Sequence, residues 1–280
     1  MNSNIKLVAI DLDGTALNSE HTMSLTTLTT LKKLADYNIK LVIASGRPLY
    51  QIKAIIDKLD LNDINDFTVA FNGAVVANNQ THHIIATNPL GGPDFRQLCQ
   101  EIIASPLTTM ILFDQPASNF NQIKIYYKEL TDDITNRYFS NLQDLPGQVE
   151  LVPYHNQEII GGKLFIEGPV AIVEKLLAKW DDKFEICQEI RNNRTNVEIT
   201  NKNITKAWGI QQICQQYNID RSQVMAIGNE HNDIEMLKWA AIGVAVANAD
   251  EDVKAIADVL TDSNDHDGVA KAINKYLFNN

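Results

Sequence analysis

Two aspartates separated by one residue follow the first apolar run of the chain, in the sequence Asp11-Leu12-Asp13-Gly14-Thr15. Side chains two residues apart in an extended segment point to the same side, and Gly14 lets the chain turn sharply. Two carboxylates this close repel each other unless a cation or a shared proton offsets their charge. An EF-hand is excluded, because Ala16 and Thr22 stand where that loop needs glycine and glutamate. The pattern therefore indicates a cation site or a proton-sharing pair, with a solvated acidic turn as the alternative.

Two further segments carry groups that suit a phosphate. Ser45-Gly46-Arg47 ends the apolar run IKLVIA, and a hydroxyl with free backbone N–H groups at such a turn suits a phosphoryl oxygen. The string is short, and alone it is more often only a turn. Lys206 begins a predicted helix. A lone lysine there is usually a solvated charge, so it gains meaning only beside Asp11.

The fourth segment, Gly228-Asn229-Glu230-His231-Asn232-Asp233, directly follows another apolar run. Acidic and amide oxygens at a strand end are good ligands for Mg²⁺. The alternative is that Asn232 and Asp233 only cap the next helix. The segment therefore predicts a second part of a cation site.

These segments are positioned by alternating strands and helices. Short apolar runs suit strands buried on both faces of a parallel sheet, and they predict strands over residues 6–10, 39–44, 67–71, 224–227, 242–247 and 259–260. Helical spacing of apolar residues predicts helices over residues 25–34, 48–59, 204–217, 232–239 and 268–277, with Ser24 as an N-cap. The alternation predicts an α/β fold with an open parallel sheet. Ligands bind beyond the carboxyl ends of strands in such sheets, so the four segments are expected to converge on one crevice.

The middle of the chain has a different pattern. Turn clusters such as residues 89–93 and 145–147 separate strand-like pieces at 122–127 and 163–167 from a helical piece at 170–180. This mixture predicts an α+β unit inserted into the α/β domain. We expect the core domain over residues 1–86 and 191–280, and the inserted unit over residues 87–190.

Composition excludes several classes of protein. The 280 residues include 24 basic and 35 acidic side chains, for a net charge of −11. That balance argues against binding to nucleic acid, which needs clustered Lys and Arg, and against docking on an anionic membrane. Three widely spaced cysteines and an N-terminus without a signal-peptide pattern predict reduced thiols and a cytoplasmic protein.

The order and spacing of the four segments resemble the haloacid dehalogenase superfamily of phosphotransferases, and most closely its Cof-type phosphatases with a C2B cap. Further matches are Phe71-Asn72-Gly73-Ala74, the strand Gly243-Val244-Ala245-Val246 followed by Asn248-Ala249, and the segment from Thr261 to Ala270. The resemblance covers nearly the whole chain. It implies a Rossmann-like parallel-sheet core with an inserted α+β cap domain.

The resemblance also implies roles for individual residues. Asp11 corresponds to the nucleophile that forms an aspartyl-phosphate, and Asp13 to the general acid and base. Mg²⁺ is the implied cofactor. The implied phosphate-binding residues are Ser45, Gly46 and Lys206; the implied substrate contacts are Arg47, Asn72 and Gly73; and the implied metal residues are Asp11, Asp13, Asn229 and Asp233, with support from Asn232.

The chain departs from the family pattern at Asn229, where the family usually has aspartate. An amide oxygen can bind Mg²⁺ but brings no charge, so weaker metal affinity is expected. The leading prediction is a Mg²⁺-dependent phosphatase of small phosphorylated metabolites, with sugar phosphates as the expected class. The alternatives are a phosphate-ligand-binding or regulatory protein with catalysis weakened through Asn229, and a phosphomutase. A nicotinamide dehydrogenase is a poor alternative, because no GxGxxG follows the first two strands.

Overall fold

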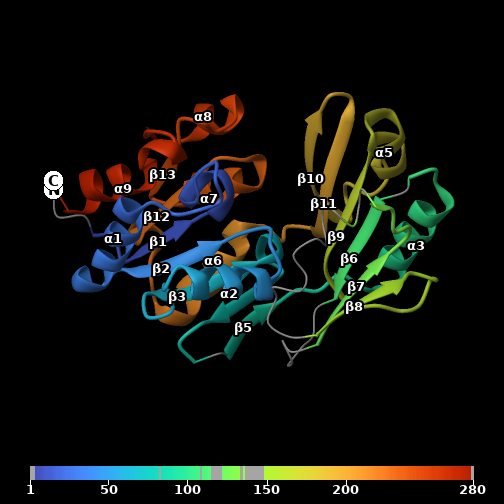
Figure 1. Ribbon diagram of the computed structural model, residues 1–280, viewed down its shortest axis with the longest axis horizontal. Helices are drawn as coiled ribbons and strands as arrows, with labels where there is room; N and C mark the ends of the chain where they lie inside the picture. Colours follow the sequence, from blue (N-terminus) through green and yellow to red (C-terminus); the bar gives the residue numbers. More distant parts are fainter. Residues whose placement is uncertain are drawn as a thin grey trace. The chain divides into compact units, whose positions relative to one another are not determined.

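The computed structural model describes residues 4–81, 83–107, 109–114, 122–132, 135 and 148–278. The chain forms two compact units, coloured along the sequence in Figure 1. The first unit combines Met1–Thr87 with Thr205–Asn280, and the second contains Asn88–Ile204. The second unit is therefore an insertion in the first.

A mixed sheet forms the centre of the first unit. Its strands are β1 (Leu7–Ile10), β2 (Lys40–Ala44), β3 (Asn65–Ala70), β4 (Val75–Asn78), β5 (His83–Thr87), β12 (Val224–Gly228), β13 (Ile242–Ala245) and β14 (Val259–Leu260). Within the described residues the sheet has eight strands, in the order β14-β13-β12-β1-β2-β3-β4-β5. The strands from β14 to β3 are parallel, whereas β4 and β5 are antiparallel to their neighbours. The predicted α/β fold with a parallel sheet is confirmed.

The apolar strands of this sheet are buried because helices flank it (Figure 1). All four residues of β1 are fully buried, as a central parallel strand requires. The helices are α1 (Leu25–Lys33), α2 (Leu49–Lys58), α6 (Lys206–Tyr217), α7 (Ile234–Trp239), α8 (Glu251–Ile256) and α9 (Gly268–Ile273). Helix α6 packs against β3, β4 and β5, and α7 packs against β12 and β13. Ser24 caps α1 as predicted, since its Oγ accepts a hydrogen bond of 3.0 Å from the backbone N–H of Thr27.

The second unit is an α+β layer with its own core. Its strands are β6 (Thr109–Asp114), β7 (Gln122–Tyr127), β8 (Gln148–Pro153), β9 (Gly161–Pro169), β10 (Phe184–Arg191) and β11 (Arg194–Asn201), and its helices are α3 (Gly92–Ala104) and α5 (Val170–Leu177). The six described strands lie in the order β10-β11-β9-β6-β7-β8. Helix α3 presents Phe95, Leu98, Cys99 and Ile102 to this core at helical spacing. These residues pack with apolar side chains of α5 and the sheet.

The second boundary of the insertion differs from the predicted one. The sequence pattern predicts it between residues 190 and 191, which lies near the end of β10. In the structure β10 and β11 pair as an antiparallel hairpin from Phe184↔Asn201 to Arg191↔Arg194. The boundary falls between Ile204 and Thr205. The reason is that the hydrogen-bonded ladder holds both strands in one sheet.

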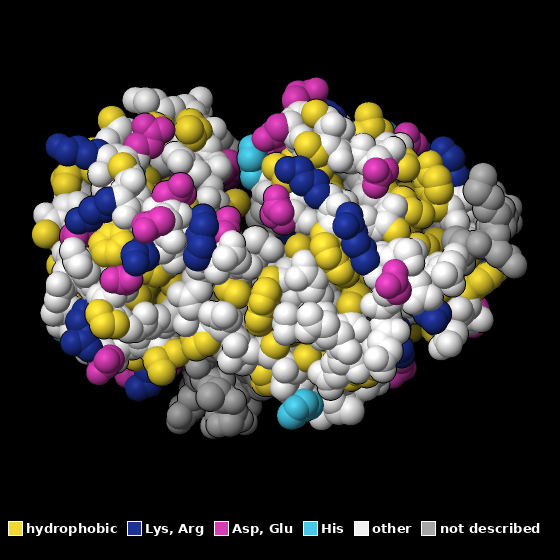
Figure 2. Space-filling model, turned by 180° about the vertical axis from the view of Figure 1, so that it is seen from behind, with side chains coloured by type: hydrophobic (Ala, Val, Ile, Leu, Met, Phe, Trp, Pro, Cys, Tyr) yellow, Lys and Arg dark blue, Asp and Glu magenta, His cyan; other side chains and the backbone are white. Residues whose placement is uncertain are grey.

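The surface is polar and mixed in charge. On the face shown in Figure 2, Lys and Arg side chains are interspersed with Asp and Glu side chains. Among the described residues, the helices are too short or too polar to cross a membrane.

The turn after β3 is held in an unusual backbone conformation. Phe71, Asn72 and Gly73 have φ angles of 51°, 54° and 112°. A Cβ atom added to Gly73 would lie 2.1 Å from the carbonyl oxygen of Thr205, the residue before α6. Only glycine therefore permits both this backbone conformation and this close approach.

We expect Gly73→Ala to lower the free energy of unfolding by about 2 kcal/mol or more, because the new methyl group must displace backbone atoms. Gly91→Ala is the matched control, since Gly91 has an extended φ of 177° and no atom within 4 Å of the added Cβ. The control should change the stability by less than about 0.5 kcal/mol. Differential scanning calorimetry of both variants measures the difference. Equal transitions would show that the turn can move away from Thr205 without loss.

Candidate active site

The carboxyl ends of neighbouring parallel strands bring the predicted segments together. Strands β1 and β12 pair in register from Leu7↔Val224 to Ile10↔Ile227, so Asp11 and Asn229 follow them at the same edge of the sheet. The next strand, β2, ends directly before Ser45. The site predicted from strand ends therefore gathers within the first unit.

Lys206 lies at the centre of this cluster. Its Nζ is 2.7 Å from Asp11 Oδ1 and 2.7 Å from Asp233 Oδ1, and the lysine side chain is only 1% exposed. Burial alone would lower the pKa of Lys206, but the two carboxylates raise it above its ordinary value. Burial raises the pKa of Asp11, although the ammonium of Lys206 opposes that rise. The lysine is therefore a charged group that links two carboxylates, not a solvated surface residue.

Asp233 holds both Lys206 and the turn after β12. Its Oδ2 accepts hydrogen bonds from the backbone N–H groups of Asn229 at 2.9 Å and of Glu230 at 3.0 Å. Its Oδ1 is the one bound by Lys206. Both oxygens are thus engaged by protein donors. In this arrangement Asp233 positions the lysine and the turn, and its predicted part in a metal site stays a prediction.

Asp13 is paired with Arg47 in a two-pronged ion pair. Arg47 Nε is 2.7 Å from Asp13 Oδ2, and Arg47 Nη2 is 2.7 Å from Asp13 Oδ1. Burial works to raise the pKa of Asp13, but the hydrogen bonds and charge of Arg47 hold it below its usual value. Both side chains remain about a third exposed. The pair is therefore accessible to a small anionic ligand.

Asn229 lies beside Asp11 and Asp13 and is 6% exposed. One terminal atom of its amide is 2.9 Å from the carbonyl oxygen of Asp13, 2.7 Å from Thr15 Oγ1 and 3.2 Å from Asp11 Oδ2. In the orientation that satisfies these acceptors, this atom is the amide nitrogen. Three polar atoms of the loop after β1 therefore converge on the end of one side chain.

Thr15 and Asn248 shape the loop after β1, although the sequence pattern gives neither of them a role. Thr15 is 1% exposed and contacts Asn229. Asn248 Nδ2 donates a hydrogen bond of 2.8 Å to the carbonyl oxygen of Gly14, and its Oδ1 accepts one from the backbone of Asn264. The only signal for Asn248 was its place in the family-like segment after β13.

The remaining predicted residues lie at the same edge. Ser45 is buried, and its Oγ accepts a hydrogen bond of 3.1 Å from the backbone N–H of Arg47 across Gly46. Asn232 Nδ2 donates to Asn72 Oδ1 at 3.2 Å. Asn232 Oδ1 is buried and makes no hydrogen bond with the described residues. It is therefore available to accept a hydrogen bond from a ligand or a water molecule.

A second group with metal-ligand chemistry lies on the surface. His231 faces two carboxylates, with Nδ1 3.3 Å from Asp250 Oδ2 and Nε2 2.5 Å from Asp252 Oδ2. The three residues are exposed and their ligand atoms lie within 4.8 Å of one another. Both ring nitrogens already face a carboxylate oxygen, so contacts among the three side chains account for the arrangement without a metal ion.

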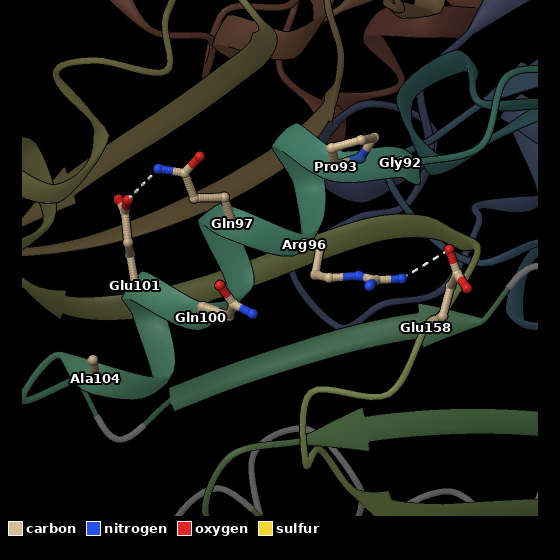
Figure 3. A pocket seen from close by; sticks show the side chains of 8 residues that line it. All are labelled: Gly92, Pro93, Arg96, Gln97, Gln100, Glu101, Ala104 and Glu158. Carbon is tan, nitrogen blue, oxygen red and sulfur yellow. Dashed lines mark hydrogen bonds and ion pairs between the residues drawn. The ribbon is translucent and has the colours of Figure 1, made fainter.

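The second unit has a cavity of about 740 Å³ beside α3, shown in Figure 3. Its lining includes Gly92, Pro93, Arg96, Gln97, Gln100, Glu101, Ala104 and Glu158. Arg96 is ion-paired with Glu158 at 2.8 Å, and Gln97 donates to Glu101 at 3.2 Å. The described lining has one basic side chain, Arg96, beside the carboxylates of Glu101 and Glu158, so this cavity offers a phosphate less positive charge than the two cations of the strand-end cluster.

We expect Lys206→Met to lower the free energy of unfolding in EDTA by about 3 kcal/mol or more, because it leaves Asp11 and Asp233 buried without their cation. Lys53→Met is the control, since Lys53 forms a half-exposed ion pair with Asp57. That substitution should change the stability by less than about 1 kcal/mol. Urea denaturation followed by circular dichroism measures both. A loss no larger than the control's would show that the carboxylates do not depend on Lys206.

Comparison with known proteins agrees with this geometry. A sequence model of haloacid dehalogenase-like hydrolases matches residues 8–273. Phosphatase YwpJ of Bacillus subtilis is 28% identical over 98% of this chain and 100% of its own, and 5-amino-6-(5-phospho-D-ribitylamino)uracil phosphatase YcsE of the same species is 28% identical over 98% and 96%. The structure of the subclass IIB sugar phosphatase BT4131 is 25% identical with a TM-score of 0.79, over 97% of this chain and 98% of its own. The chain therefore belongs to the haloacid dehalogenase-like hydrolases and is an enzyme of the phosphatase type.

Proposed function

We propose that this enzyme is a Mg²⁺-dependent phosphatase that hydrolyses small phosphorylated metabolites, with sugar phosphates as the substrate class. The observation that carries the proposal is the buried carboxylate of Asp11, held 2.7 Å from Lys206 at the end of a central strand with Asp13 two residues away. A nucleophile, a cation and a second carboxylate are the groups that phosphoryl transfer through a covalent intermediate needs. Two of the similar proteins support this substrate class, since BT4131 is named a sugar phosphatase and YcsE is named a phosphatase of a phosphoribitylamino compound.

The donor set beside Asp11 fits Mg²⁺. The end of the Asn229 side chain lies 2.9 Å from the carbonyl oxygen of Asp13 and 3.2 Å from Asp11 Oδ2. Mg²⁺ prefers such oxygen ligands. We infer that Asp11, Asp13 and the amide oxygen of Asn229 hold the ion, with the buried Oδ1 of Asn232 as an acceptor nearby. When bound, Mg²⁺ supplies positive charge that offsets the charge of the phosphoryl oxygens.

The phosphate group is held by donors that surround Asp11. The ammonium of Lys206 has three N–H donors, of which Asp11 and Asp233 engage two. The Ser45-Gly46-Arg47 turn adds a hydroxyl, backbone N–H groups and a guanidinium. Arg47 binds Asp13 through two donors in the structure. A phosphate dianion is a strong acceptor for the same donors, so it competes with Asp13 for Arg47.

The reaction follows from these positions. When Arg47 turns to the phosphate, Asp13 loses the partner that keeps it ionised and takes up a proton from water. An Asp11 oxygen then attacks phosphorus, the bond between phosphorus and the ester oxygen breaks, and protonated Asp13 gives its proton to the leaving alkoxide. Asp13, now a carboxylate, takes a proton from a water molecule, whose oxygen attacks phosphorus of the aspartyl-phosphate. The bond from phosphorus to Asp11 then breaks and releases inorganic phosphate. Asp13 thus serves as acid in the first step and as base in the second.

The first test is hydrolysis of p-nitrophenyl phosphate with Mg²⁺ and with EDTA, for the wild type and for Asp11→Asn. We expect EDTA and the substitution each to lower the rate by at least about a thousandfold, because one removes the cation and the other the nucleophile. Asp57→Asn is the control for a lost carboxylate, since Asp57 is exposed on α2. The control should keep the wild-type rate within about twofold.

Asp13→Asn separates the two chemical steps. Because p-nitrophenolate leaves without a proton, this variant should release a burst of one nitrophenolate per enzyme and then turn over slowly. An absence of turnover with p-nitrophenyl phosphate and with a panel of sugar phosphates, at every Mg²⁺ concentration, would overturn the phosphatase proposal. Binding of those sugar phosphates without turnover would favour a regulatory protein, and isomerised product would favour a phosphomutase.

We expect Arg47→Lys to raise KM for p-nitrophenyl phosphate by about tenfold, because lysine cannot bind a phosphate through two parallel donors. Steady-state kinetics with saturating Mg²⁺ measures the change. Arg221→Lys is the control, since Arg221 is exposed and binds the backbone oxygen of Lys238. A tenfold fall in kcat with an unchanged KM would mean that Arg47 acts only by orienting Asp13.

A further inference from the structure

The amide of Asn229 can face the proposed cation site in two orientations, with either its nitrogen or its oxygen toward Asp11 and Asp13. Its terminal atom faces the carbonyl oxygen of Asp13 at 2.9 Å and Asp11 Oδ2 at 3.2 Å, and both are acceptors. An amide nitrogen in that place donates hydrogen bonds to both. An amide oxygen in the same place completes a set of three oxygens, which repel each other unless a cation lies among them.

We propose that the Asn229 amide turns over when the metal binds: its nitrogen faces Asp11 and Asp13 in the metal-free enzyme, and its oxygen faces the ion in the loaded enzyme. This inference rests on the proposed Mg²⁺ site. Aspartate at this position has no such alternative, because both of its oxygens are acceptors. The amide therefore stabilises the metal-free site, and Mg²⁺ must displace its hydrogen bonds while gaining a neutral ligand instead of a charged one.

The surrounding groups permit this exchange. The hydroxyl of Thr15 lies 2.7 Å from the same terminal atom, and a hydroxyl donates to an oxygen or accepts from a nitrogen. Asp233 does not replace the missing charge, because Lys206 and two backbone N–H groups engage its oxygens. The side chain of Asn229 is buried, so water does not readily take over the hydrogen bonds that the amide makes.

Isothermal titration of Mg²⁺ into the metal-free protein tests the exchange. We expect Asn229→Asp to lower Kd by at least about tenfold, because it adds ligand charge and removes the competing hydrogen bonds. The variant should also melt at a lower temperature than the wild type in EDTA, and gain more from added Mg²⁺. Asn38→Asp is the control, since it adds the same charge at an exposed residue before the amino end of β2, away from the strand ends that hold Asp11 and Asn229. It should change Kd by less than about threefold.

Nuclear magnetic resonance of the wild type labelled with [¹⁵N]asparagine tests the exchange without depending on whether a variant folds. The Asn229 amide signal should show slow hydrogen exchange without metal, and should shift and lose that protection when Mg²⁺ is added. An unchanged Asn229 signal, or equal Kd values for wild type and Asn229→Asp with tight binding in both, would overturn the amide exchange while leaving the metal site in place. An absence of Mg²⁺ binding in both proteins would overturn the proposed cofactor and the exchange together.

Discussion

The contact on which the site depends is the buried ammonium of Lys206 between two carboxylates. Asp11, Lys206 and Asp233 come from three segments that are far apart in the sequence, and each distance to the ammonium is 2.7 Å. A buried charge without a partner is strongly destabilising. The three segments must therefore reach the same point together, so the energy that holds the site is also energy that holds the fold. The placement of these three side chains and the stability of the fold are not separable here.

The parallel sheet makes this meeting possible. Strands β1 and β12 are neighbours in register, so their carboxyl ends deliver Asp11 and the Asn229 turn to one edge. Lys206 reaches that edge from the first turn of α6, whose N-cap is Thr205. Gly73 lies against the carbonyl oxygen of Thr205. The strained turn after β3 and the start of α6 thus fix each other. A side chain at residue 73 would push the lysine away from both carboxylates.

Local pattern is sufficient to predict the six described parallel strands of the first unit and its helices α1, α2, α6, α7 and α9, because apolar runs, caps and turn residues act over a few positions. It is not sufficient for β4 and β5, whose antiparallel pairing needs contacts with a strand already in place. The predicted boundary of the second unit is also wrong, because the pairing of β10 with β11 keeps both strands in one sheet. The ion pair of Asp13 with Arg47 joins residues 34 positions apart, and no periodicity in the sequence indicates it.

The charge balance of the cluster explains why an amide is tolerated where the family usually has a carboxylate. In the described part of the chain, the carboxylates of Asp11, Asp13 and Asp233 face the cations of Lys206 and Arg47, which leaves a small negative excess that a divalent ion can reverse. A further carboxylate at residue 229 would deepen that excess in a buried place, and the metal-free fold would bear the repulsion. The amide avoids this repulsion. With a divalent ion bound, the site also carries more positive charge toward a phosphate dianion than it would with aspartate at residue 229. If the proposed Mg²⁺ site is correct, we expect the amide at residue 229 both to weaken metal binding and to strengthen the attraction of a phosphate.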